Sequence, residues 1–160
     1  MRPVRTRRRV LESLAKTKAL LDVRADSRLQ HHALSEAVLH QIDATFVALV
    51  RQVGDAHGFK PENIQSLEDL VDQLRNRQLV SLEAQKLERL ANDPMSWWNA
   101  YQAHAAQILC PAEVIDSLDV NRIPLTDISG LDQLKTERYA SWVGELSTLV
   151  ADLQAQFDES

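Results

Sequence analysis

Apolar residues recur at helical spacing over most of the chain, most clearly between residues 27 and 57. The stripe in that segment consists of Leu34, Val38, Ile42, Thr45, Leu49 and Val53. Further valines and alanines widen it, so the middle of this helix is apolar on nearly every side, which is typical of the central helix of a bundle. Asp26 or Ser27 can cap its first turn, Gly54 and Gly58 mark its end, and Pro61 prevents simple continuation.

Five further helices are predicted from the same spacing, over residues 5–24, 66–77, 81–91, 94–109 and 130–157. Ser66 followed by Asp69 resembles a capping box, and Ser81 can cap the next helix. Asp93 and Pro94 suit the first turn of the helix after that. In the helix over 81–91, the residues expected to face inward are Leu82, Leu87 and Leu90.

The lengths of these segments predict an all-α fold in one domain, 1–160. The helices over 5–24, 27–57, 94–109 and 130–157 are long enough to form a four-helix-type bundle, while the two short helices between them form an inserted helical hairpin. Residues 110–128 lack helical spacing and are expected to form one long irregular loop before the last helix. The low content of glycine and proline, 4 and 5 residues, favours helix as well.

Composition narrows the classes of protein to consider. A hydrophobic share of 44% with 26% charged residues is typical of a folded domain rather than a disordered chain. Cys110 is the single cysteine, so an internal disulfide and a cysteine metal cluster are excluded; it is expected to be a small buried hydrophobe. No uncharged apolar run of about 18 residues is present, which predicts no membrane span and a cytoplasmic location.

Charge is unevenly distributed along the chain. Residues 1–25 hold 8 Lys/Arg against 2 Asp/Glu, and residues 26–160 hold 10 against 21, so a segment of +6 precedes a body of −11. The basic N-terminal segment, 1–9, contains Arg2, Arg5, Arg7, Arg8 and Arg9, and the pattern leaves open whether it is ordered. Arginines can neutralise nucleic-acid phosphates, but residues 1–45 contain no aromatic side chain for base stacking. The favoured interpretation is that the basic segment complements the negative charge of the acidic body, within the molecule or between copies.

Two groups of polar residues suggest chemistry. His32, Glu36, His40 and Asp43 share one face of the helix over 27–57 and include ligand types suited to zinc or iron. A metal site needs ligands that converge from several helices, and His104 is the nearest candidate by type, so a solvated polar stripe is favoured. The second group is similar to the arginine and histidine pair of some helical RNA-cleaving domains. It consists of Arg24 with His31, or of Arg28 with His31 and His32.

Trp97 and Trp98 are a candidate partner-binding pair, because tryptophan is enriched where proteins bind one another. Adjacent residues of a helix point about 100° apart, so we expect one of the two in the core and the other partly exposed.

Several segments together are similar to an uncharacterised bacterial family of short all-helical proteins, catalogued only as a domain of unknown function. They are Arg5-Thr6, the run from Leu34 to Val53, the residues Asp93-Pro94-Met95-Ser96-Trp97, and the final helix with Trp142. The resemblance covers nearly the whole chain. It implies an all-helical bacterial protein of the cytosol, and it supplies no activity or catalytic residues.

The leading hypothesis is a non-catalytic helical module for protein–protein interaction or structure, which binds a protein partner or a second copy. Its candidate binding residues are Arg5, Arg7, Arg8, Arg9, Trp97 and Trp98, and no cofactor is expected. Two alternatives remain open: a nucleic-acid-binding protein that uses the basic N-terminal segment, and a metal-dependent enzyme of the helical-bundle type.

Overall fold

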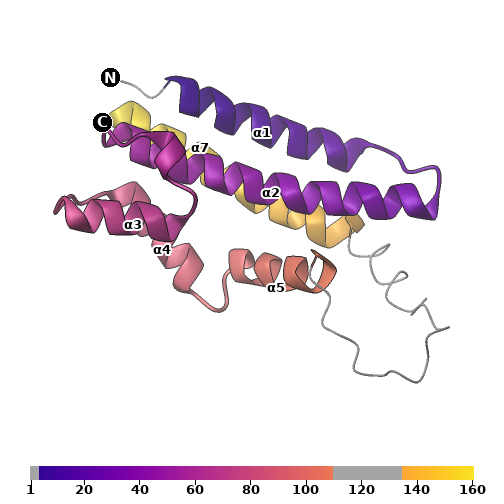
Figure 1. The fold of residues 1–160 in the computed structure, drawn as a ribbon. Coiled ribbons are helices and arrows are strands. Elements are labelled where there is room, and N and C mark those ends of the chain that lie inside the picture. The colour runs from indigo at the N-terminus through magenta and orange to yellow at the C-terminus, as the bar shows by residue number, and fades with distance from the viewer. Residues whose placement is uncertain (1–3, 110–134) are drawn as a thin grey trace.

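The computed structural model describes residues 4–109 and 135–160, and in these ranges it contains helices and turns but no strand (Figure 1). The elements are α1 (Val4–Asp22), α2 (Arg28–Ala56), the 3-10 turn η1 (Pro61–Asn63), α3 (Leu67–Asn76), α4 (Leu82–Asn92), α5 (Trp97–Leu109), the π-helical turn η2 (Lys135–Tyr139) and α7 (Ala140–Glu159). The all-α fold class is therefore confirmed. The predicted loop over 110–128, which includes Cys110, lies outside the described residues.

The centre of the molecule is α2, which contacts α1, α3, α4, α5 and α7. Figure 1 shows α1, α2 and α7 side by side, with the α3–α4 hairpin and α5 packed against them. Leu39, Ile42, Leu49 and Val53 of α2 have no exposed surface, which confirms the prediction of a central helix. The length of α2 and the mean hydropathy of 1.3 of its most apolar 18-residue window would also suit a membrane span, but half of that window is buried inside the structure, as in the core helix of a bundle.

Serine side chains begin three of the helices as predicted. Ser27 accepts a hydrogen bond from the Gln30 amide, Ser66 from that of Asp69, and Ser81 from that of Ala84. Each satisfies one of the backbone donors that a helix start leaves unpaired.

Two local predictions were wrong. The helix expected from residue 94 begins at Trp97 instead, because the Ser96 hydroxyl accepts a hydrogen bond from the Asn99 amide and outcompetes Pro94 as the start signal. Leu82, expected to face inward, is 67% exposed, because it occupies the first position of α4, ahead of the turn that packs on the core.

The basic N-terminal segment is helical from residue 4 onward. Val4 begins α1, so Arg5, Arg7, Arg8 and Arg9 lie on its first two turns. A helix turns about 100° per residue, so these arginines point in different directions and have different neighbours. Residues 4–9 thus form the first turns of α1.

Aromatic rings join α2, α5 and α7. Trp98 of α5 stacks on Phe46 of α2 with ring centroids 3.9 Å apart, and Tyr101 lies edge-on to Trp142 of α7 at 5.8 Å. The Tyr101 hydroxyl donates a 2.7 Å hydrogen bond to the backbone carbonyl of Leu39. Such ring pairs stabilise a core beyond the area that they bury.

The contact between α1 and α2 is unusually polar. Thr45 Oγ1 lies 2.9 Å from Ser13 Oγ and 3.4 Å from Thr17 Oγ1, and the Thr17 hydroxyl donates to the backbone carbonyl of Ser13 at 2.8 Å. All three residues are buried. Their small side chains satisfy one another and let the two helix backbones approach closely.

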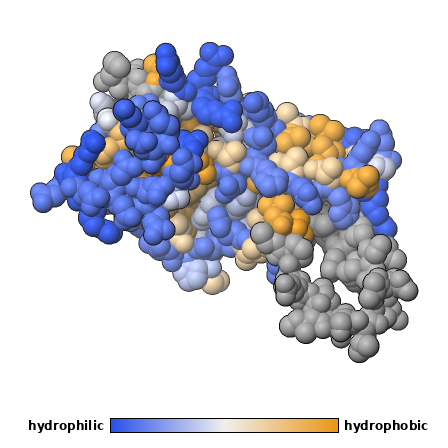
Figure 2. Space-filling model, in the orientation of Figure 1, coloured by the Kyte–Doolittle hydropathy of each residue, from blue (hydrophilic) through white to orange (hydrophobic). Residues whose placement is uncertain are grey.

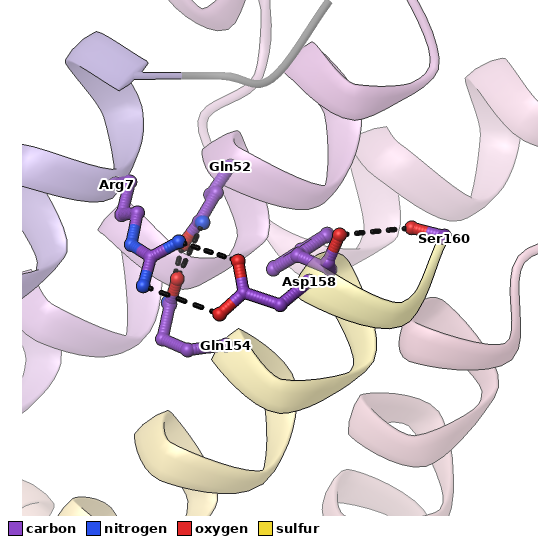
Figure 3. A network of polar contacts seen from close by, with 6 residues as sticks. Arg7, Gln52, Gln154, Asp158 and Ser160 are labelled. Carbon is purple, nitrogen blue, oxygen red and sulfur yellow. Dashed lines mark hydrogen bonds and ion pairs between the residues drawn. The ribbon is translucent and has the colours of Figure 1, made fainter.

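A second buried polar contact joins α2 to α7 (Figure 3). The side-chain amides of Gln52 and Gln154 donate to each other's carbonyl oxygens at 2.9 and 2.8 Å, and both residues are buried. Beside this pair, nearer the surface, the Arg7 guanidinium of α1 donates to the Asp158 carboxylate of α7 at 2.8 Å. These contacts hold three helices together at the end of the bundle where both termini lie.

Candidate functional site

The four N-terminal arginines separate into two pairs with different surroundings. Arg7 forms its ion pair with Asp158, and Arg8 forms one with Glu12, one turn further along α1. Arg5 and Arg9 form no ion pair or hydrogen bond with the residues that the structure describes, and both are exposed. Two of these four arginines therefore complement carboxylates of the same molecule, and the other two remain available to a ligand.

Arg5 and Arg9 lie along one edge of a groove between α1 and α2, with a volume of about 470 Å³. Its lining consists of Arg5, Thr6 and Arg9 from α1, Ala44, Val47, Ala48 and Arg51 from α2, and Pro61 from η1. Residues four apart share one side of a helix, which places both α1 arginines at the groove. The alanines of α2 in this lining have small side chains, so the floor of the groove is apolar and close to the α2 backbone. The groove therefore combines cations at its edges with a hydrophobic base.

Arg51 is held in position by other parts of the chain. Its Nε donates to the backbone carbonyl of Ile64 at 2.8 Å, and its Nη2 donates to the Gln65 side chain at 3.2 Å. A guanidinium fixed in this way loses little further freedom when it binds an anion through its remaining donors.

The charge of the groove is entirely positive. Arg5, Arg9 and Arg51 line it, and none of its described lining residues is acidic. Outside the lining, the Asp55 carboxylate accepts a 2.8 Å hydrogen bond from the hydroxyl of Thr6, which is a lining residue. Guanidinium groups recognise carboxylates and phosphates through paired hydrogen bonds. The arrangement thus suits an anion that also carries apolar surface.

Sequence reasoning missed Arg51, because it lies 42 residues beyond Arg9 in a segment interpreted only as core. A signal was present: between Arg28 and Arg51 the chain contains no lysine or arginine. A single cation near the end of an otherwise apolar and acidic stretch marks a position where α2 reaches the surface.

Among the described residues, the metal candidates do not form a metal site. His32, Glu36, His40 and Asp43 follow one side of α2, and within residues 4–109 and 135–160 no group of three or more His, Cys, Asp or Glu is placed to hold a metal ion. His104 is buried on α5, where its Nε2 forms a 2.7 Å hydrogen bond with the Tyr139 hydroxyl. A single helix supplies ligands to one side of an ion only.

Arg24 and His31 do line one open pocket, with a volume of about 490 Å³, beside Asp22 and the start of α7. Arg28, the other arginine considered, is exposed and is not part of this lining. His32 is half-buried, and its Nε2 has no hydrogen-bond partner among the described residues.

The tryptophan pair is divided as predicted. Trp98 is 5% exposed and belongs to the core, whereas Trp97 is half-buried and meets Trp98 edge-on at 5.7 Å. Trp97 is therefore the member of the pair with surface to offer a partner.

Stability is expected to depend on pH through His104. Burial lowers the pKa of His104, and the charge of Arg138 acts in the same direction. In the unfolded chain His104 has the ordinary histidine pKa of about 6.5, so it is protonated at a higher pH than in the folded chain. Stability therefore falls as the pH decreases below about 6.5. In urea unfolding at pH 7 and pH 5, the wild type should lose more stability than His104→Gln does. Equal losses in the two proteins would contradict this assignment.

Comparison of the chain with protein-family models, with curated proteins and with solved structures finds no match.

Proposed function

We propose that this protein is an interaction module whose groove between α1 and α2 binds an acidic, amphipathic segment of a protein partner. The observation that carries the proposal is the convergence of Arg5, Arg9 and Arg51 on one groove with an apolar floor and no described acidic residue in its lining. An amphipathic helix presents carboxylates and apolar side chains on one face, which is the combination that this groove complements.

Charge and apolar contact have different roles in this recognition. Each exposed arginine contributes at most about 1 kcal/mol to an ion pair, because water and salt screen it. The arginines therefore select an acidic partner and orient it, while contact with Val47, Ala44 and Ala48 adds the remaining affinity. Arg51, already anchored, is the arginine best prepared to bind.

The test uses a fluorescein-labelled peptide of about 18 residues, five turns of helix, with Glu and Leu on one face and Ala elsewhere. Fluorescence anisotropy should show binding that weakens as salt is raised. We expect the double variant Arg5→Ala/Arg9→Ala to bind about tenfold more weakly, because it loses two ion pairs of up to about 1 kcal/mol each.

The matched control is Arg8→Ala/Lys18→Ala, which removes two positive charges from the same helix but none from the groove. This control should bind the peptide almost as the wild type does. Equal weakening in both double variants would show a general effect of charge, and no weakening in either would disprove the proposal.

Nucleic acid is the competing ligand in the same assay. A labelled single-stranded DNA of about 20 nucleotides, which can contact several arginines at once, replaces the peptide in a second series. The proposal requires that the peptide bind more tightly than the DNA at physiological salt. DNA that binds more tightly and depends on Arg5 and Arg9 would assign the groove to nucleic-acid binding instead.

A further inference from the structure

A second groove opens on the other side of Val47, between α2 and the elements α3, α4 and α5. Its volume is about 300 Å³, and its charged lining residues are Asp43 and Glu68. Val47, Phe46 and Trp98 form part of its apolar wall, and no described lysine or arginine lines it. Its charge is therefore opposite to that of the arginine-lined groove.

The two grooves are neighbours. Val47 contributes to the lining of both. The hydrogen bond from Arg51 Nη2 to Gln65 Oε1, 3.2 Å long, joins a lining residue of the basic groove to one of the acidic groove. A basic depression and an acidic depression thus adjoin along α2, separated by little more than one side chain.

Neither carboxylate of the acidic groove is neutralised by an ion pair within the described part of the chain. Asp43 and Glu68 form none there, just as Arg5 and Arg9 form none. Burial raises the pKa of Asp43, and the opposing influence of His40 on the same helix only partly offsets this effect. A guanidinium brought against this carboxylate would favour its charged form.

A surface with adjacent basic and acidic halves is complementary to its own copy. When two copies face each other across a two-fold axis, each half of one surface meets the opposite half of the other. We propose that the partner bound at the arginine-lined groove is a second copy of this chain, in a symmetric dimer with Val47 of both copies near the axis. Arg5 and Arg9 of each copy then face Asp43 and Glu68 of the other. This inference rests on the proposed function and names its partner.

The contacts of such a dimer include both the charged residues and the apolar walls of the two grooves. Every ion pair occurs twice, once on each side of the axis, so a change at one residue alters two contacts. The apolar walls around Val47 meet at the centre, where they exclude water from the surrounding pairs. Figure 2 shows mostly hydrophilic residues over the N-terminal half of α1 and over the α3–α4 hairpin.

The test is sedimentation velocity at several protein concentrations in physiological salt, with circular dichroism to verify that each variant folds. The wild type should form a dimer. Arg9→Glu places two carboxylates against each other at both contacts, and Asp43→Arg does the same with two cations. Each variant should raise the dimer dissociation constant at least about tenfold, because like charges across an interface repel strongly.

An equimolar mixture of these two variants provides the decisive measurement. In the mixed dimer the two introduced side chains, a carboxylate and a guanidinium, meet at one contact. The unchanged Arg9 of one copy meets the unchanged Asp43 of the other at the second contact, so opposite charges meet at both. The mixture should therefore dimerise where each variant alone does not. The control Arg8→Glu, which changes charge outside both grooves, should dimerise as the wild type does.

Three results would overturn the inference: a wild type that stays monomeric at every concentration, a dimer insensitive to both charge reversals, or a mixture that stays monomeric although both variants are folded. A monomeric wild type that still binds the acidic peptide through Arg5 and Arg9 would reject the dimer and leave the proposed function intact. Loss of the peptide result, with a dimer that responds to charge as described, would limit the groove to self-association.

Discussion

Replacing Trp98 with alanine is expected to lower the free energy of unfolding by about 3–5 kcal/mol, the usual cost of removing a large buried aromatic side chain. Trp98 is 5% exposed and stacks on Phe46 at a centroid distance of 3.9 Å, so the substitution leaves a cavity between α2 and α5. Neighbouring rings are fixed by contacts of their own, such as the hydrogen bond of Tyr101 to Leu39, and cannot collapse into it. Urea unfolding followed by far-ultraviolet circular dichroism measures the loss.

The control is the adjacent substitution, Trp97→Ala. Trp97 packs against the core but is only half-buried, so its removal should cost less than half as much. Similar losses for the two variants would mean that both tryptophans are core residues, contrary to the arrangement described.

The second large effect is expected at the buried glutamine pair. Gln52→Ala leaves the amide of Gln154 without a partner in a part of the core closed to water, and it also opens a cavity. An unsatisfied buried polar group costs about 1–3 kcal/mol, and the cavity adds to this, so we expect a total loss of about 2–4 kcal/mol.

The double variant Gln52→Leu/Gln154→Leu tests this explanation. It removes both amides and keeps most of the side-chain volume, so its stability should lie within about 1 kcal/mol of the wild type or above it. A double variant that loses as much as Gln52→Ala would show that packing, rather than an unpaired amide, determines the cost. Urea unfolding of the two variants and the wild type distinguishes these outcomes.

The sequence predicted the helices well because their signals are local. Apolar spacing identified α2 as the central helix, and the serine caps marked three helix starts within a residue. The predicted start of α5 was wrong because two local signals competed, Asp93-Pro94 and Ser96, and the hydrogen bond from the Asn99 amide to the Ser96 hydroxyl places the start after Ser96. The prediction that Leu82 faces inward was wrong because periodicity identifies the apolar side of a helix but not where along the helix the contact with the core begins.

The candidate site could be predicted only in part. Spacing shows that Arg5 and Arg9 share a side of α1, but it does not show that Asp158, 151 residues away, neutralises Arg7. Nor does it place Arg51 opposite Arg5 and Arg9, because that depends on how α1 crosses α2. The basic segment was thus recognised as a feature of the chain, while its division into paired and available arginines is a product of tertiary structure.

The polar contact between α1 and α2 links the groove to the local stability of the first helix. Of the four buried residues of α1, Val10 and Leu14 are apolar and Ser13 and Thr17 are polar, so undocking this helix separates Ser13 and Thr17 from Thr45 of α2. Undocking also removes one wall of the arginine-lined groove, and an occupant can bind only while the helix is docked. Binding of the proposed partner is therefore expected to shift this equilibrium by mass action, and to slow hydrogen exchange of the backbone amides of α1 as the groove is filled.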